Sequence, residues 1–411
     1  MNIKKNLEAN YEKNIVKQDY NKNICINVIN DKIEKGLSGN IKCTKGIFNT
    51  WNDISIDILK SSIQKYIRRG MLEKAYWCLI EFDILYQYFT QLKNIKSYEL
   101  KSDIIKKINN IQNVDNLYIN NFLNKSIRLQ ENLINRLKII CCEDISIGNI
   151  YMPVILDDLL QIVGSTNNMC IRMQTMMQII KILTLSKKSR EIDHIKIVYY
   201  DVLKTDNSSH FFNKYYNTYC FNKLNNKELF HKQFNITCLD NFKLEFDKNN
   251  DSCFYWFFQF IFSNNLSHKF TKHFTKHFIN YIINNETDCQ YLNIYHVLYK
   301  WFRNASSKDF WIFGCQIILL SLRKHLIPSI LIDRSIHEAC SDWESHYINS
   351  LNFSTISIDD YCIDLHTSQG RILGKNIIDF VTQGSVVLNE SSFTNNTYKD
   401  IYVEYLLSVK K

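Results

Sequence analysis

The sequence predicts an all-α protein, a helical bundle arranged in two domains, and three observations support this. The 411 residues include only 10 glycines and 2 prolines, too few for the many tight turns of an all-β architecture. Hydrophobic residues make up 45% of the chain and aromatic residues 13%, enough to fill two cores at about 150 residues for each domain. Apolar residues also recur at helical spacing from Asp53 onward.

The first segment of the chain differs from the rest. Residues 1–48 are rich in lysine and asparagine and show little apolar periodicity. So few apolar side chains cannot repay the entropy lost when a segment becomes ordered. We therefore expect residues 1–48 to form a disordered, mobile arm.

A helical hairpin is expected next. Residues 54–67 carry isoleucine, leucine and tyrosine at helical spacing, which predicts the first helix. Gly70 supplies a C-terminal stop, and Glu73 places a negative charge in the first turn of the following helix. The second helix is amphipathic over residues 72–85.

Further helices are expected over residues 98–111, 114–142, 153–163 and 168–185. Pro153 would then stand in a first helical turn, where its missing N–H costs nothing. We place an N-terminal helical domain over residues 49–201, a linker region over 202–250 and a second helical domain over 251–411. The linker is placed there because asparagine, lysine and tyrosine become more frequent.

Three segments of the N-terminal domain follow the order and spacing of a known family. They run from Ser61 to Phe82, from Asn135 to Asn149 and from Ile182 to Asp201. The matching positions include Arg68, Arg69, Gly70, Ala75, Tyr76, Trp77, Arg136, Leu137, Glu143, Asp144, Ile145 and Gly148. They resemble the helical C-terminal collar of the replication-associated recombination protein A family, which are clamp-loader-like ATPases. The resemblance covers roughly residues 53–201 and implies a collar-like domain that self-associates, as collar helices do in a ring.

The family has an ATPase module before its collar, whereas only residues 1–52 precede the collar-like region here. We therefore expect no ATPase domain in this chain, and a separate ATPase is a candidate partner. A phosphate loop needs Gly-x-x-x-x-Gly-Lys-Ser/Thr. The nearest match, Gly370 to Asn376, is one residue short and ends in asparagine, so we interpret it as a basic turn between two short elements.

The main functional hypothesis is a non-catalytic, oligomerising factor in DNA replication, recombination or repair. A net charge of +9 permits attraction to nucleic acid without requiring it. Basic clusters would meet a DNA strand or a replication partner. The residues predicted for this contact are Arg68, Arg69, Lys187, Lys188, Arg190, His366, Arg371 and Lys375.

Four residues of the collar-like motifs are predicted to be structural, namely Trp77, Arg136, Glu143 and Asp144. Glu143 and Asp144 are successive residues, which do not share a helical face and cannot easily converge on one cation. One of the two carboxylates could cap the next helix, or pair with Arg136 or with a basic residue of the first hairpin.

The C-terminal part of the chain concentrates its scarce glycines. Gly370, Gly374 and Gly384 fall within fifteen residues, which suggests unusual backbone torsions or a close approach to a partner. The pattern Asp-x-His-Thr-x-x-Gly-Arg-x-x-Gly-Lys, which begins at Asp364, resembles a segment of collar-like proteins from large DNA viruses.

Two roles stay open for this pattern. Arg371 and Lys375 lie four residues apart and could grip phosphates near His366. Alternatively, Asp364 could orient His366, and the segment could be a docking turn against the helical core.

Two other classes of function also stay open. One is a protein-interaction scaffold that does not bind nucleic acid. The other is an enzyme acting on nucleotides or nucleic acid, with His366 as base and with Asp364 and Arg371 beside it in one pocket.

No metal, cofactor or membrane segment is expected. His273 and His277 are four residues apart, as two metal ligands would be, but Phe274 stands where a zinc protease needs glutamate. We instead expect a helix with Phe270, Phe274 and Phe278 buried and its basic residues outside. The 13 cysteines include no Cys-x-x-Cys pair. The sequence shows neither a signal peptide nor a membrane span, so we expect a cytoplasmic or nuclear location, or the host cytoplasm for a viral protein.

Overall fold

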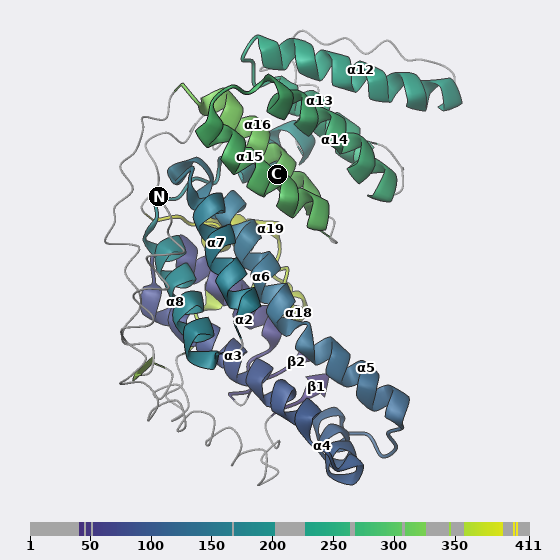
Figure 1. The fold of residues 1–411 in the computed structure, drawn as a ribbon, viewed down its shortest axis with the longest axis vertical. Helices are drawn as coiled ribbons and strands as arrows, with labels where there is room; N and C mark the ends of the chain where they lie inside the picture. The colour runs from purple at the N-terminus through teal and green to yellow at the C-terminus, as the bar shows by residue number, and fades with distance from the viewer. Residues whose placement is uncertain are drawn as a thin grey trace. The chain divides into compact units, whose positions relative to one another are not determined.

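The computed structural model describes residues 41–44, 47–50, 52–166, 168–201, 227–263, 268–305, 309–325, 345–346, 357–388, 398 and 400–401. Most of these residues are helical, which confirms the predicted all-α fold (Figure 1). Two short strands, β1 (Cys43–Thr44) and β2 (Ile47–Phe48), pair antiparallel. The predicted mobile arm falls almost entirely outside the described residues.

The chain divides into two compact units. Unit 1 contains residues 1–137, 155–186 and 332–389, and unit 2 contains residues 138–154, 187–331 and 390–411. This division differs from the predicted domains 49–201 and 251–411, because each unit is assembled from segments that are distant in the sequence. The predicted linker also contains a helix, α12 (Lys227–Asp247).

Unit 1 is a helical bundle with a short C-terminal addition. Its helices are α2 (Ile56–Arg68), α3 (Leu72–Asn94), α4 (Tyr98–Asn109), α5 (Asn116–Ile127), α8 (Met169–Leu185), α18 (Ser368–Ile372) and α19 (Ile377–Asp379), with the short turns η5 (Asp360–Cys362) and η6 (Phe380–Gly384). The unit boundary falls within α6 (Leu129–Ile140) and α7 (Met152–Ser165).

The predicted hairpin of unit 1 is confirmed as α2 and α3, which pack against each other and against α8 (Figure 1). Gly70 has φ +70°, a left-handed conformation that glycine adopts without strain. This conformation lets the N–H of Met71 donate to the carbonyl of Tyr66 at 2.9 Å, which closes the end of α2. The chain can then reverse direction into α3.

The later helices of the N-terminal region follow the predicted order. The helix predicted over 98–111 is α4, and its start is capped by Ser97, whose side chain accepts a hydrogen bond from the N–H of Leu100. Pro153 lies in the first turn of α7, as expected. The single helix predicted over 114–142 is instead two helices, α5 and α6, with a break at Arg128.

Unit 2 has a core rich in aromatic residues. Its elements are η1 (Cys141–Ile145), η2 (Ser146–Gly148), α9 (Glu191–Lys196), η3 (Ile197–Asp201), α12, α13 (Cys253–Ser263), α14 (His268–Asn285), α15 (Cys289–Asn304) and α16 (Phe310–Arg323). Phe257 and Phe278 are fully buried, with ring centroids 5.8 Å apart in an edge-to-face arrangement. Gly314 on α16 lies against Phe257, where a Cβ would be 3.0 Å from the ring, so the two helices approach closely.

Among the helices of the described part of the chain, none is both long enough and apolar enough to span a membrane.

Candidate functional site

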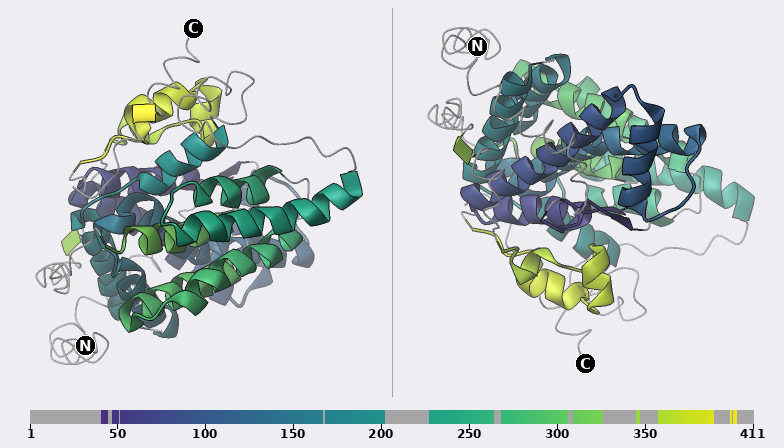
Figure 2. Two further views of the ribbon diagram at one scale, coloured as in Figure 1. Left: turned by 90° about the horizontal axis from the view of Figure 1, so that it is seen from above. Right: turned by 90° about the horizontal axis from the view of Figure 1, so that it is seen from below.

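Residues 357–388, which we name the C-terminal segment, pack along α2 in unit 1. Figure 2 shows this segment in yellow beside the purple part of the chain that includes α2. The fold thereby joins residues that are as much as 320 positions apart, since the N–H of Leu388 donates to the carbonyl of Arg68 at 3.3 Å. It brings the predicted residues Arg68 and Arg69 to the same region as His366, Arg371 and Lys375.

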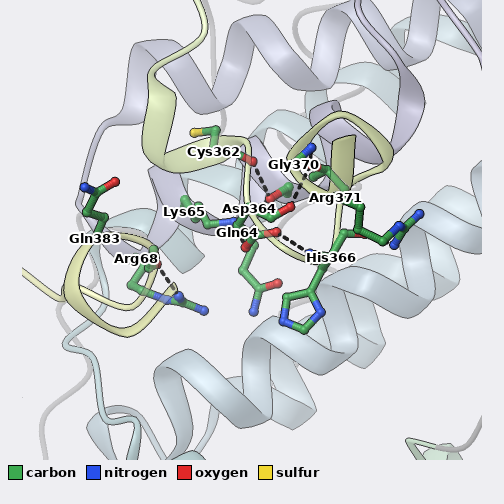
Figure 3. Close-up of polar contacts among 12 residues, drawn as sticks. Gln64, Lys65, Arg68, Cys362, Asp364, His366, Gly370, Arg371 and Gln383 are labelled. Atoms are coloured by element: carbon green, nitrogen blue, oxygen red, sulfur yellow. Dashed lines mark hydrogen bonds and ion pairs between the residues drawn. The ribbon is translucent and has the colours of Figure 1, made fainter. Parts of the chain in front are cut away.

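A buried ion pair lies at the centre of this contact. The Nζ of Lys65 is 2.5 Å from Oδ2 of Asp364, and both side chains are almost completely buried (Figure 3). The other carboxylate oxygen, Oδ1, accepts a hydrogen bond from the backbone N–H of His366 at 2.9 Å. Burial lowers the pKa of Lys65, and the negative charge of Asp364 opposes that effect. Because each charge would be costly to bury alone, the pair holds the C-terminal segment in register on α2.

A tight turn follows Asp364. The backbone carbonyl of Asp364 accepts hydrogen bonds from both the N–H and the Oγ1 of Thr367, each at 2.9 Å. Thr367 in turn caps α18, because its Oγ1 accepts from the N–H of Gly370 at 3.0 Å. A Cβ on Gly370 would lie 1.8 Å from the Asp364 carbonyl oxygen, so no other residue fits there without moving the backbone.

The other two glycines of the C-terminal segment also serve its local structure. Gly374 ends α18 with φ +70°, and the N–H of Lys375 donates back to the carbonyl of Gly370 at 2.9 Å. A Cβ on Gly384 would be 3.2 Å from Cε of Lys65, so this glycine permits close packing on α2.

The near match to a phosphate loop is therefore a helix and its cap. The N–H groups of Gly374 and Lys375 donate to carbonyls of the same turn, at 3.2 and 2.9 Å. A phosphate cradle needs such N–H groups directed at the ligand. The geometry agrees with a basic turn between two short elements.

Arg68 and Arg69 hold the C-terminal segment rather than face solvent as a pair. Arg68 is buried, and its Nη1 donates to the carbonyl of Gly384 at 2.7 Å. Arg69 donates to the carbonyl of Gln383 and places its guanidinium 3.7 Å from the centre of the Tyr361 ring. Both guanidinium groups are thus directed at carbonyls where η6 ends, Arg68 from a buried position and Arg69 from a half-buried one, and contact of either arginine with DNA stays a prediction.

The other predicted residues of this region are more accessible. His366 and Arg371 are exposed. Arg371 donates to the carbonyl of His366 at 3.2 Å and to Oγ of Ser368 at 3.3 Å. Lys375 forms an ion pair of 2.6 Å with Asp360, and the hydrogen bond from Lys375 to this carboxylate raises the pKa of the lysine.

Asp364, His366 and Arg371 do not converge on one point. Asp364 is turned toward Lys65, whereas the side chains of His366 and Arg371 point away from that pair and from each other (Figure 3). The imidazole of His366 lies edge-on to Phe380, with 5.2 Å between ring centroids. The arrangement that the enzyme hypothesis required is not present in this conformation.

Arg371 instead borders a shallow groove of about 600 Å³ between α18 and the start of α2. Its polar lining includes Asn49, Asp53, Ser55 and Ser368. Beside it, Asp57 accepts hydrogen bonds from the hydroxyl of Ser55 and the N–H of Ser368. Burial raises the pKa of Asp57, but these hydrogen bonds outweigh it and lower the pKa overall.

Lys187, Lys188 and Arg190 lie in unit 2 and belong to a different structure. The turn that contains them packs on η1 and η2, where the N–H of Ser189 donates to the carbonyl of Asp144 at 2.9 Å. A Cβ on Gly148 would be 2.3 Å from the carbonyl oxygen of Lys187, so the approach is close. Lys187 is exposed, whereas Lys188 and Arg190 are buried.

The buried charges of this turn surround Asp144. Its Oδ1 is 3.5 Å from Nε of Arg190, which also pairs with Asp193. Burial lowers the pKa of Lys188 to about 7, and the negative charge of Asp144 opposes this shift. Lys188 and Arg190 are therefore packed inside unit 2, and their predicted contact with DNA stays a prediction.

The four predicted structural residues have distinct surroundings. Trp77 is buried in α3, Glu143 is half-buried, and Asp144 is completely buried. Arg136 donates to Oε1 of Gln64 at 3.3 Å. The cations beside Asp144 are thus Arg190 and Lys188, from the third segment of the family resemblance.

Sequence reasoning missed a buried ionic network in unit 2. Arg323, at the end of α16, lies 2.8 Å from Glu191 and 2.6 Å from Asp251. These hydrogen bonds and negative charges outweigh the effect of burial and raise the pKa of Arg323. The available signal was a charged residue, Arg323, at the end of a helix that is otherwise uncharged, but its partners are far away in the sequence.

The histidine-rich helix is α14. His273 and His277 are exposed, with ring centroids 6.4 Å apart, and Phe278 is buried as predicted. The prediction for Phe270 is wrong, since its side chain is 43% exposed. Across the residues whose placement is described, no group of three or more His, Cys, Asp or Glu side chains could hold a metal ion.

No protein-family model, curated protein or solved structure matches this chain.

Proposed function

We propose that this protein is a non-catalytic factor that acts by binding, with nucleic acid as its ligand, in replication, recombination or repair. The setting comes from the resemblance of residues 53–201 to the collar of clamp-loader-like ATPases, and a separate ATPase remains a candidate partner. The net charge of +9 favours a polyanionic ligand.

The Lys65–Asp364 pair is the observation that carries the non-catalytic part of this proposal. The stretch from Asp364 to Lys375 is the part of the chain most similar to a catalytic or phosphate-binding loop. In the fold this stretch packs on α2 and helps to hold residues 357–388 there. With its carboxylate 2.5 Å from Lys65, Asp364 is not available to orient the imidazole of His366 as a general base. Of the predicted contact residues, Lys187, His366 and Arg371 are exposed, and Arg69 and Lys375 are half-buried. These are the side chains accessible enough to meet a strand.

Binding of labelled single-stranded and duplex DNA to the full chain, measured by fluorescence anisotropy over a salt series, tests this function. We expect an affinity that falls linearly with salt on logarithmic axes, with a slope that reports the number of phosphate contacts. Absence of binding at low salt would overturn the nucleic-acid function. Nucleotide or DNA turnover that is lost in His366→Ala, without loss of folding, would overturn the non-catalytic assignment.

A second candidate, a scaffold that assembles through protein contacts, is favoured by an apolar ridge in the C-terminal segment. Ile372 is 84% exposed, Leu373 57% and Ile377 48%. Apolar side chains that stand together on a surface often mark an interface. The occupant we propose for the ridge is a second copy of this chain, because the family resemblance implies self-association.

Sedimentation velocity tests the ridge as a self-association surface. Ile372→Asp should convert oligomers to monomers if two copies meet there. Leu117→Asp is the matched control, because Leu117 on α5 is 68% exposed and lies outside the ridge. A monomeric parent protein, or equal behaviour of the two variants, would rule out self-association through the ridge.

A further inference from the structure

We propose that one face of unit 2, made by the N-terminal half of α14 and the C-terminal end of α15, binds the phosphate backbone of a nucleic acid. We name it the α14–α15 face and define it by Lys269, His273, Lys276, Lys300 and Arg303. This inference rests on the proposed function but assigns the contact to residues outside the predicted set.

All the charged residues of these two helices are basic. Their sequences contain Lys269, Lys272, Lys276, Lys300 and Arg303, and neither helix contains an aspartate or a glutamate. They also contain four histidines, which add positive charge when protonated. On most helices oppositely charged neighbours cancel such a field, whereas here nothing within either helix does so.

The charged residues of α14 share one face. Lys269, His273, Lys276 and His277 follow the i, i+4, i+7, i+8 spacing, which places them along one stripe of a helix. Lys269 and both histidines are exposed, and Lys276 is half-buried. The opposite stripe is in the core, where Phe278, Ile279 and Ile282 are buried.

Lys272 joins α14 to the end of α15. Its Nζ donates to the carbonyl of Arg303 at 2.9 Å and to that of Ala305 at 2.5 Å, so it caps α15. Arg303 and Lys300 are both exposed at this end. Burial lowers the pKa of Lys272, and the nearby charge of Lys276 lowers it further, as expected where like charges crowd together. Figure 1 shows the two helices next to each other.

The acidic residues of the neighbouring elements are mostly engaged elsewhere. Glu286 and Asp288 connect the opposite ends of α14 and α15, 2.6 and 3.7 Å from Lys324. On α12, Asp247 accepts a hydrogen bond from Tyr281, and Asp240 is 3.9 Å from Lys243. Asp309, which precedes α16, is the acidic residue nearest to this end of α15 in the sequence.

A nucleic acid fits this face better than an anionic membrane does. A helix that lies on a membrane needs a continuous apolar face toward the lipid, but the apolar face of α14 is already buried in unit 2. Phe270 lies beside the basic stripe and is 43% exposed. Of the large apolar side chains of α14 that the structure describes, it is the exposed one. One exposed ring next to cations suits the stacking of an unpaired base.

The test compares two charge-matched triple variants of the full chain. Lys269→Gln, Lys276→Gln and Arg303→Gln remove three cations of the α14–α15 face and spare Lys272, which caps α15. Lys96→Gln, Lys107→Gln and Lys125→Gln remove three exposed lysines of unit 1 and are the control. The probes are a labelled single strand and the corresponding duplex, and circular dichroism verifies that both variants are folded.

We expect the first variant to bind the single strand at least about tenfold more weakly at physiological salt and to lose about 2 from the slope of log affinity against log salt, while the control changes little. If the parent protein binds DNA and the two variants weaken equally, the α14–α15 face is not the site, but the proposed function stands. If the parent protein binds no DNA, both proposals fail. Preferential binding to phosphatidylserine vesicles, lost only in the first variant, would replace the nucleic acid by a membrane surface.

Discussion

Two lysine-rich stretches of unit 2 look similar in the sequence and behave differently in the fold. Lys187, Lys188 and Arg190 occur in a turn that packs against Asp144, so two of these three cations are buried. Lys269, Lys272 and Lys276 occur on one helix that contains no acidic residue. The number of basic residues does not separate the two stretches. What distinguishes them is the charge nearby: the first stretch packs against a buried carboxylate, whereas the second lies on a helix without acidic residues.

The largest expected effect is on the buried stretch. Asp144→Asn removes the carboxylate beside Lys188 and Arg190 and should lower the free energy of unfolding by about 3 kcal/mol, because a buried charge loses its partner. Urea denaturation measures this change. Asp240→Asn is the control, since Asp240 is exposed and 3.9 Å from Lys243, and it should change stability by less than about 0.5 kcal/mol. Similar losses in the two variants would contradict the distinction between the stretches.

A smaller effect is expected in the pH dependence of stability. The pKa of Lys188 is about 7 in the fold and 10.5 ordinarily, so between these values the unfolded chain binds more protons. The free energy of unfolding should therefore rise with pH in this window.

Lys188→Met should remove this contribution, since the new side chain does not titrate. Between pH 7 and pH 8.5 the parent protein should gain up to about 2 kcal/mol relative to the variant. Urea denaturation at the two pH values measures the difference. Parallel pH profiles for the two proteins would show that Lys188 keeps its charge when buried.

The smallest expected effect concerns the exposed stretch. Phe270→Ala should weaken single-stranded DNA binding by about 1 kcal/mol and leave duplex binding unchanged, because a paired base cannot stack on the ring. Anisotropy titrations with both probes measure this, and Phe270→Tyr should retain the parent affinity. An equal loss for strand and duplex would show that the ring acts only by supporting the fold of α14.

Local chemistry was sufficient to predict the all-α class and much of the helix order. The periodicity of residues 54–67, the stop at Gly70 and the position of Pro153 each depend on neighbours within one or two helical turns. For the same reason the clustered glycines correctly indicated special backbone, and Gly374 has φ +70°. The break at Arg128 was missed, because apolar periodicity continues through it.

Only the tertiary structure decided which charges are accessible. Arg68 is buried because the C-terminal segment packs over it, and its partner, the carbonyl of Gly384, is 316 positions away in the sequence. Lys65 pairs with Asp364 of the same segment. Lys188 lies against Asp144 through the packing of two turns. The sequence determines where helices begin and how their apolar faces repeat, since these follow from short-range backbone geometry. Whether a cation on such a helix is buried or exposed to a ligand depends on the segment that packs beside the helix. The apolar periodicity of the helix gives no information about that segment.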